Sequence, residues 1–189
     1  MPIAQIFNVL YWAWVGSEAI LQIGMRTWRG KGEVKDRGSL LILLPAIFFS
    51  IWAAFWWGET HPHTMFDGAH WLRTVAVVLI ATGLAIRWTA IISLGRSFST
   101  NVAIRSGQSL YRGGLYRLVR HPSYTGMLFC FVSIGVWERN WISLALSVVP
   151  PVAALLYRMH VEEAALVSAF GDEYLQYSRE ARRILPGIY

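Results

Sequence analysis

The sequence predicts an all-α integral membrane protein with five transmembrane helices. Of its 189 residues, 55% are hydrophobic and 15% are charged, whereas a soluble domain of this size carries about 25% charged residues. Apolar stretches occur at five places: residues 3–25, 39–58, 71–94, 123–137 and 141–160. Four of these stretches approach the roughly 20 residues that a helix needs to cross the hydrocarbon of a bilayer.

The fourth stretch is shorter than the other four. We expect it to form a tight helical hairpin with the fifth stretch, turned by residues 138–140. Beyond the fifth stretch, apolar and aromatic side chains recur every three or four residues, at Leu166, Phe170, Tyr174 and Tyr177. This spacing predicts an amphipathic C-terminal helix that continues from the fifth span.

Positive charges lie on alternate connections between the predicted helices. Connections 26–38 and 95–122 and the C-terminal tail are rich in arginine and lysine, whereas connections 59–70 and 138–140 hold one arginine between them. The cytoplasmic connections of membrane proteins carry the excess of Lys and Arg. The pattern therefore places the N-terminus outside and both basic connections and the C-terminus in the cytoplasm.

We expect a single membrane domain over residues 1–189, because no linker, low-complexity tract or internal repeat divides the chain. Residues 1–94 would form three N-terminal transmembrane helices, and residues 95–189 would form the half that carries the polar motifs. The net charge of +6 does not indicate a nucleic-acid partner, because the basic residues lie in short stretches beside apolar segments. Membrane lipids with anionic headgroups explain these charges better.

Two polar islands stand at the cytoplasmic ends of apolar stretches, and such groups in a membrane protein mark a functional site by default. Residues 120–126 have the sequence Arg-His-Pro-Ser-Tyr-Thr-Gly, and residues 158–163 contain Arg158 and Glu162 on one helical face. A helix that begins at Pro122 presents free N–H groups and the positive end of its dipole to an anion. The alternatives are a junction that faces lipid headgroups and an ordinary helix-surface ion pair.

Two further charges, Glu18 and Arg87, lie inside apolar stretches, each seven residues from a cytoplasmic end. Their equal depth predicts a structural ion pair between the first and third helices, with a role in the active site as the alternative. The histidines of the outer connection, His61, His63 and His70, have no cysteine and few acids beside them. We interpret them as solvated loop residues and expect no metal site.

Four sequence features resemble the isoprenylcysteine carboxyl methyltransferase family. They are the segment 120–126, the Gly-Gly-Leu-Tyr sequence at 113–116, the pair Glu162-Glu163, and the segment 170–174 followed by Tyr177. The resemblance covers roughly residues 95–189, about half of the chain. It implies S-adenosylmethionine as the cofactor and a cytoplasmic cofactor pocket closed by loop 95–122 and the C-terminal helix.

The resemblance also implies roles for individual residues. It assigns Arg158 to the acceptor as the catalytic residue. The cofactor contacts that it implies are Tyr116, His121, Pro122, Ser123, Tyr124 and Glu162, together with Ala103, Gln108, Ser109, Leu110 and Tyr111 in the preceding loop. Glu162 suits the amino group and sulfonium of the cofactor, the start of the fourth helix suits its carboxylate, and an aromatic wall suits its adenine.

These features lead to the hypothesis of methyl transfer to a lipophilic or lipid-modified acceptor, foremost the C-terminal carboxylate of an isoprenylcysteine-like substrate. A carboxylate is ionised at neutral pH and needs a cation to orient it, not a general base. A phospholipid amine or a small thiol remains an alternative acceptor, with His160 or His121 as base. A sterol-type reductase that uses NADPH and a membrane scaffold without activity remain the alternatives to a methyltransferase.

Overall fold

The computed structural model describes residues 2–27, 33–34, 38–61, 70–95, 103–104 and 109–185. Helices dominate these ranges, as predicted, and they are α1 (Ile3–Thr27), α2 (Ser39–Thr60), α3 (Trp71–Leu94), α4 (Pro122–Glu138), α5 (Trp141–Phe170) and α6 (Asp172–Glu180). A 3-10 helix, η2 (Gly114–Arg117), precedes α4. The sequence analysis did not predict the short antiparallel pair of β1 (Glu33–Val34) and β2 (Ala103–Ile104), which joins two connections.

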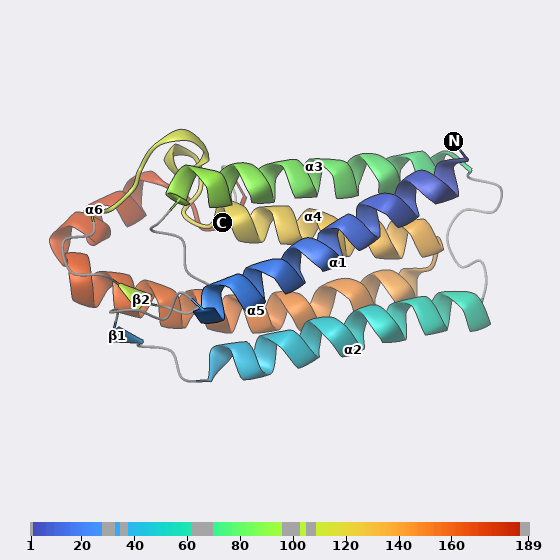
Figure 1. The fold of residues 1–189 in the computed structure, drawn as a ribbon, viewed down its shortest axis with the longest axis horizontal. Coiled ribbons are helices and arrows are strands. Elements are labelled where there is room, and N and C mark those ends of the chain that lie inside the picture. Colours follow the sequence, from blue (N-terminus) through green and yellow to red (C-terminus); the bar gives the residue numbers. More distant parts are fainter. Residues whose placement is uncertain are drawn as a thin grey trace.

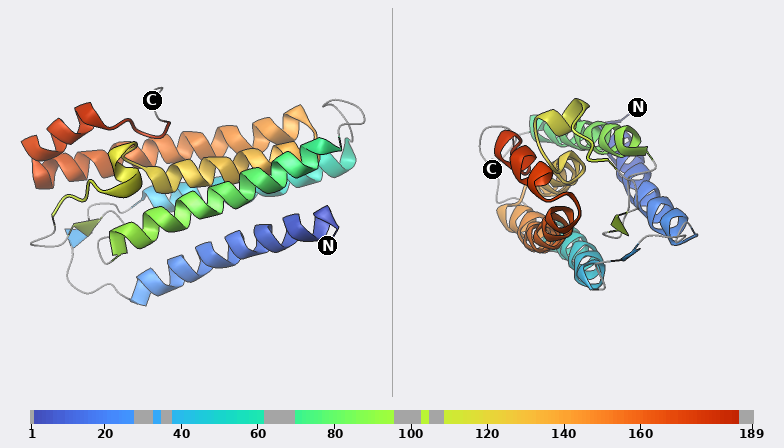
Figure 2. Two further views of the ribbon diagram at one scale, coloured as in Figure 1. Left: turned by 90° about the horizontal axis from the view of Figure 1, so that it is seen from above. Right: turned by 90° about the vertical axis from the view of Figure 1, so that its left-hand side faces the viewer.

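Helices α2 to α5 run along the length of the molecule, and α1 crosses them obliquely (Figures 1 and 2). Three helices, α2, α3 and α5, are long and apolar enough to cross a membrane, with mean hydropathies of 2.1, 2.1 and 1.6. Large apolar side chains cover the outside of α2, where Phe48, Phe49 and Trp52 are exposed. A surface of this kind suits lipid rather than water.

The predicted hairpin of α4 and α5 is present, and its turn has two local causes. Arg139 adopts a left-handed conformation with φ 52°, which ends α4. The side chain of Asn140 then accepts hydrogen bonds from the backbone N–H groups of Ile142 and Ser143, at 2.9 and 3.2 Å, and so caps α5. Because α4 has 17 residues, a stretch of α5 of equal length ends near Arg158. The turn therefore places Arg158 level with the first residue of α4.

Helices α3 and α4 approach each other more closely than side chains would allow. A Cβ atom added to Gly83 would lie 2.6 Å from the carbonyl oxygen of Gly126, and one added to Gly126 would lie 2.6 Å from that of Gly83. Small residues at a helix interface allow such backbone contact inside membranes. The glycine that ends the 120–126 motif is therefore a packing residue.

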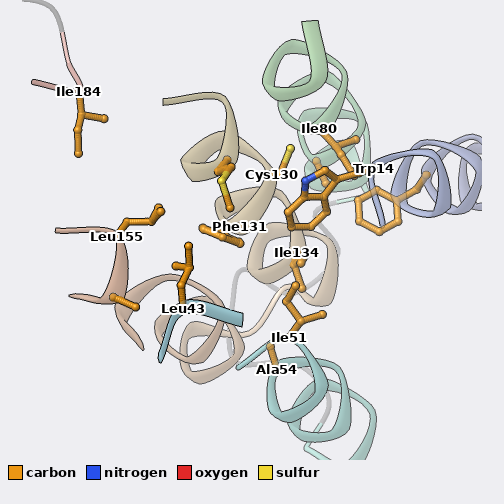
Figure 3. Packing of buried hydrophobic residues seen from close by; sticks show 14 of the residues in the cluster. Trp14, Leu43, Ile51, Ala54, Ile80, Cys130, Phe131, Ile134, Leu155 and Ile184 are labelled. Carbon is orange, nitrogen blue, oxygen red and sulfur yellow. The ribbon is translucent and has the colours of Figure 1, made fainter. Parts of the chain in front are cut away.

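The hydrophobic core lies between the helices and receives side chains from all of α1 to α5 (Figure 3). Helix α1 contributes the fully buried Trp14, whose ring meets Phe131 of α4 edge-on at 5.6 Å. Phe7, in the first half of α1, stacks on Trp137 near the end of α4, with ring centroids 4.1 Å apart. These contacts hold α1 across α4, although α1 packs along α3.

The chain turns back after α5 and returns to the start of α4. Gly171, with φ 54°, separates α5 from α6, so the prediction of one continuous helix through Tyr177 was wrong. Beyond α6, the carbonyls of Arg182 and Arg183 accept hydrogen bonds from the N–H groups of Arg120 and His121, at 2.7 and 3.0 Å. The returning segment therefore holds the residues that lead into α4.

We expect Gly126→Ala to lower the unfolding temperature of the detergent-solubilised protein, because the added methyl group would force α3 and α4 apart. Overpacking of this kind costs about 1–3 kcal/mol. Gly16→Ala is the matched control, since nothing lies within 4 Å of a Cβ atom at Gly16 and Ala favours a helix interior by about 0.5–1 kcal/mol. Equal unfolding temperatures for the two variants would contradict the backbone contact.

Candidate active site

The site begins at the first turn of α4, which starts with Pro122 as predicted. Proline is well suited to this position because it lacks the N–H group that would be unpaired there. The N–H groups of Tyr124 and Thr125 bond to the carbonyl of His121, at 3.0 and 3.1 Å. Among the hydrogen bonds of the described residues, the N–H of Ser123 has no acceptor. We expected several free N–H groups at this turn, and the structure leaves that of Ser123.

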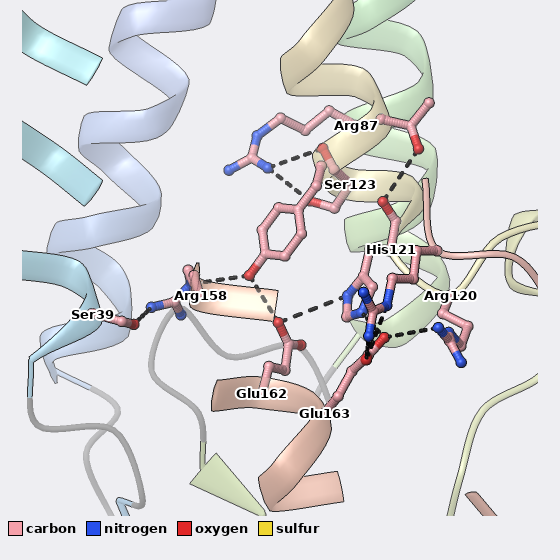
Figure 4. A network of polar contacts seen from close by, with 11 residues as sticks. Ser39, Arg87, Arg120, His121, Ser123, Arg158, Glu162 and Glu163 are labelled. Carbon is pink, nitrogen blue, oxygen red and sulfur yellow. Dashed lines mark hydrogen bonds and ion pairs between the residues drawn. The ribbon is translucent and has the colours of Figure 1, made fainter. Parts of the chain in front are cut away.

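The hydroxyl group of Tyr124 joins the two polar islands (Figure 4). It donates to Oε2 of Glu162 at 2.8 Å and accepts from Nε of Arg158 at 3.0 Å. Nη1 of Arg158 donates to the hydroxyl of Ser39, in the first turn of α2, at 2.7 Å. The Arg158 side chain is thus held at two of its nitrogen atoms while the residue is only 3% exposed. The two polar islands therefore meet at Tyr124.

His121 faces both glutamates of the second island. Its ring stacks on that of Tyr124, with centroids 5.4 Å apart and planes 15° from parallel. Nδ1 lies 3.8 Å from Oε2 of Glu162, and Nε2 lies 3.2 Å from Oε1 of Glu163. The histidine is buried, so these contacts fix its orientation between α4 and α5.

The two adjacent glutamates differ in their surroundings. Glu163, with a side chain 13% exposed, also pairs with Arg120 at 3.1 Å and with Arg183 at 2.9 Å. Glu162 is 32% exposed, and both of its contacts with described residues use Oε2. Within the described part of the chain, no contact of its Oε1 is recorded. Glu163 therefore links parts of the fold, whereas Glu162 has an oxygen available to a ligand.

Residues 111–116 bring two tyrosines to the end of the bundle where the polar islands lie. Because Gly113 has no side chain, the hydroxyl of Tyr111 can approach it; a Cβ atom there would lie 2.7 Å from that oxygen. The rings of Tyr111 and Tyr116 meet edge-on at 5.6 Å. Burial, and after it the negative charge of Glu162, raises the pKa of Tyr116. The Tyr116 hydroxyl therefore stays protonated within electrostatic reach of Glu162.

A tyrosine of α6 supports this arrangement. The hydroxyl of Tyr177 donates to the carbonyl of Tyr116 at 2.6 Å, and burial raises the pKa of Tyr177 to about 12. It remains a hydrogen-bond donor at every physiological pH. Tyr177 and the buried Tyr174 pack against Leu110, Leu166 and Phe170. The aromatic residues of the C-terminal motif thus position the segment that precedes α4.

The structure brings together most of the residues predicted for the site, and their individual roles stay predictions. His121, Tyr124, Arg158 and Glu162 belong to one polar network, and Ser123, next to Tyr124 in the chain, contacts Arg87 (Figure 4). Tyr116 and Tyr111 lie beside each other. Other predicted residues are Pro122, which begins α4, Leu110, which packs on the α6 tyrosines, and the exposed Ser109. Ala103 lies in β2, its side chain is not described, and Gln108 lies outside the described residues.

Sequence reasoning missed several residues of this network. Ser39 lies 119 residues from Arg158, its hydrogen-bonding partner, and no spacing rule connects them. Arg183 was interpreted only as a topological charge and Arg120 as part of the first polar island, and neither was expected to pair with Glu163. The ion pair of Glu18 and Arg87 was predicted and is present, but its extension to Ser123 was not.

Histidines of the connection after α2 show no metal-binding geometry in the part that the structure describes. No group of three or more His, Cys, Asp or Glu side chains suited to a metal occurs among the described residues. The ring of His61 stacks on Trp57 with centroids 4.1 Å apart, and its Nδ1 lies 2.9 Å from the hydroxyl of Thr60. His63 lies outside the described residues.

Comparison with known proteins identifies the family. Residues 75–168, which include both polar islands, match the model of the isoprenylcysteine carboxyl methyltransferase (ICMT) family. The chain belongs to this family. The match to the model begins in α3 and ends within α5, so it contains the hairpin and the first turn of α4.

Individual members of the ICMT family resemble the chain over its greater part. It is 34% identical over 120 residues to protein-S-isoprenylcysteine O-methyltransferase B of Arabidopsis thaliana, covering 62% of this chain and 59% of the relative. It is 33% identical over 118 residues to protein-S-isoprenylcysteine O-methyltransferase of Schizosaccharomyces pombe, covering 61% and 50%. The chain thus spans between half and three fifths of the length of these relatives.

A solved structure shares the fold. The eukaryotic intramembrane Ras methyltransferase ICMT, solved without a monobody, superposes with a TM-score of 0.62 at 25% identity. The match covers 77% of this chain and 52% of that one. The chain therefore shares its helical arrangement with this solved structure.

We expect Glu162→Gln to weaken the binding of S-adenosylhomocysteine, measured by calorimetric titration of the detergent-solubilised protein. Loss of a hydrogen bond to a charged group costs about 1.5–3 kcal/mol, and the isosteric amide leaves no cavity. Unchanged affinity would remove Glu162 from the cofactor site.

Glu163→Gln is the matched control for this experiment. It removes the charge that neutralises Arg120 and Arg183, so we expect it to lower the unfolding temperature more than Glu162→Gln does. The reverse order of the two unfolding temperatures would contradict the different surroundings of the two glutamates.

Proposed function

We propose that the protein is a membrane-embedded methyltransferase that uses S-adenosylmethionine to methylate the C-terminal carboxylate of an isoprenylcysteine-like acceptor. The observation that carries this proposal is the hydroxyl of Tyr124, which joins Glu162 to Arg158. Through it, a carboxylate suited to a cationic cofactor and a guanidinium suited to an anionic acceptor lie side by side. Membership in the ICMT family supports the same reaction.

The side chains at the start of α4 fit S-adenosylmethionine. Glu162 is partly exposed, and its Oε1 is placed to accept hydrogen bonds from an ammonium group. The N–H of Ser123, at the positive end of the α4 dipole, suits a carboxylate. Tyr111, 38% exposed, offers aromatic surface to an adenine ring, and the buried Tyr116 packs against it edge-on. Each charged or aromatic part of the cofactor thus has a complementary group at this end of the bundle.

Arg158 is the residue that would orient the acceptor. When bound, S-adenosylmethionine supplies a methyl group bonded to a positively charged sulfur. A free carboxylate, with a pKa near 3.5, is already a nucleophile at neutral pH, so no side chain needs to remove a proton. A guanidinium binds a carboxylate through two parallel hydrogen bonds and fixes its plane. Its contacts with Tyr124 and Ser39 hold that guanidinium in a set direction, and positioning is the main contribution that this reaction needs.

We further propose that α1 and α4 cross the membrane together with α2, α3 and α5, which gives five transmembrane helices. The charge pattern of the sequence then supports an external N-terminus and a cytoplasmic site and C-terminus. The polar cofactor would reach the site from the cytoplasm, and the lipid chain of the acceptor would remain among the helices or in the bilayer. This arrangement lets one site accept two substrates of opposite polarity.

Calorimetric titration with two ligands tests the proposed function. We expect S-adenosylhomocysteine to bind the detergent-solubilised protein and NADPH not to bind, because the site offers an acid to a cationic cofactor. Binding of NADPH alone would favour a reductase, and binding of neither ligand would favour a scaffold. The pH profile of methyl transfer then separates acceptors: a flat rate from pH 6 to 8 indicates a carboxylate, and a steep rise an amine or thiol.

Arg158→Lys separates catalysis from cofactor binding. Lysine keeps the positive charge, but it cannot contact Tyr124 and Ser39 together while presenting a planar pair of donors. We expect near-normal affinity for S-adenosylhomocysteine and methyl transfer reduced about 10²-fold, since misplacement by an ångström can cost that much. Turnover at the parent rate would show that Arg158 does not hold the acceptor. Loss of cofactor affinity together with easy unfolding would show a structural role instead.

A further inference from the structure

Arg87 of α3 connects three helices inside the apolar part of the bundle. Its Nε and Nη2 atoms donate to the two carboxylate oxygens of Glu18 on α1. Its Nη1 atom donates to the hydroxyl of Ser123 at 2.7 Å and lies 3.4 Å from the carbonyl oxygen of the same residue. Arg87 is 5% exposed, so one buried guanidinium joins α1, α3 and the first turn of α4; Figure 4 shows its contacts with Ser123.

The stability of the fold alone does not account for this pair. Arg87 is buried and the Glu18 side chain is 23% exposed, and replacement of a buried ion pair by apolar residues of similar volume is often neutral or stabilising. Arg87 also places a positive charge beside the positive end of the α4 dipole, which is unfavourable. Glu18 offsets that charge. An arrangement with these costs is explained if the hydrogen bond to Ser123 serves the site.

The chemistry of a hydroxyl group shows what that hydrogen bond achieves. A serine hydroxyl has one proton to donate and two lone pairs that accept. Because Arg87 occupies a lone pair of Ser123, the hydroxyl proton must point away from α3. The same contact fixes the Ser123 rotamer, and the contact with the carbonyl steadies the turn that leaves the N–H of this residue without an acceptor among the described residues. Both donors of Ser123 then remain for an anionic ligand.

We propose that Arg87, held by Glu18, is a positioning residue that orients Ser123 for the carboxylate of the cofactor. This inference rests on the proposed function, in which the first turn of α4 binds S-adenosylmethionine. Arg87 acts through Ser123 and does not itself touch the cofactor. The pair of Glu18 and Arg87 is thus an extension of the cofactor site into the bundle rather than a packing element.

A double substitution tests this role without leaving an unpaired charge. Glu18→Leu with Arg87→Met replaces the ion pair by apolar side chains of similar volume. We expect an unfolding temperature close to that of the parent and an affinity for S-adenosylhomocysteine about 3- to 10-fold lower, the effect of one hydrogen bond. Arg73→Met is the matched control, because Arg73 lies on the same helix about 21 Å away and contacts the ring of Trp137. It should lower stability and leave affinity unchanged.

Thermodynamic coupling to Ser123 distinguishes positioning from a structural role. Ser123→Ala should weaken S-adenosylhomocysteine binding in the parent but have much less effect in the Glu18→Leu/Arg87→Met background. Residues that act through one another show such non-additivity, whereas independent residues give additive effects. Additive losses would overturn the proposal even if the double substitution lowers affinity.

The remaining outcomes separate this proposal from the proposed function. If the parent does not bind S-adenosylhomocysteine, the proposed function fails, and with it the basis of this inference. If the parent binds and the double variant binds equally well, Arg87 is only structural. If the double variant does not fold, Arg87→Lys takes its place in the experiment. The single ammonium group of lysine can bind Glu18 but cannot at the same time donate to Ser123 as the guanidinium does. Parent-like affinity in that variant would overturn the proposal.

Discussion

The close approach of α3 and α4 at Gly83 and Gly126 is the constraint on which the site depends. The two backbones touch there, with room for no side chain on either helix. Gly126 lies one helical turn after Pro122, so the contact also sets the position of the first turn of α4. It places Arg87, one turn beyond Gly83, beside Ser123. A looser interface would separate that pair and move the start of α4 away from α5.

The second constraint is the unequal environment of two adjacent acids. Glu163 is surrounded by His121, Arg120 and Arg183, which come from the segment before α4 and from the C-terminal return. Glu162 instead accepts a hydrogen bond from the hydroxyl of Tyr124 on α4. Successive residues of a helix are rotated by about 100° from each other, so neighbours in sequence face different partners. One acid can therefore hold the fold while the next remains available to a ligand.

Features with a signature in the sequence could be predicted, and contacts without such a signature could not. The hairpin was predicted because a short apolar stretch and three polar residues precede a long one, and the pair of Glu18 and Arg87 because both charges lie at equal depth. The break at Gly171 was missed because the apolar spacing continues through it. The pairing of residues 119 and 182 and the hydrogen bond between Ser39 and Arg158 have no signature in the sequence. Both join residues that only the packed helices bring together.

The environment of Arg158 links the fold to the chemistry. The hydroxyls of Tyr124 and Ser39 accept hydrogen bonds from its guanidinium and set its direction. A guanidinium whose direction is fixed binds a carboxylate in one plane. The same two hydroxyls come from α4 and α2, so the direction of Arg158 depends on how α2 packs against the hairpin. The N-terminal helices, which carry no family motif that we recognise in the sequence, therefore contribute to the geometry of the site.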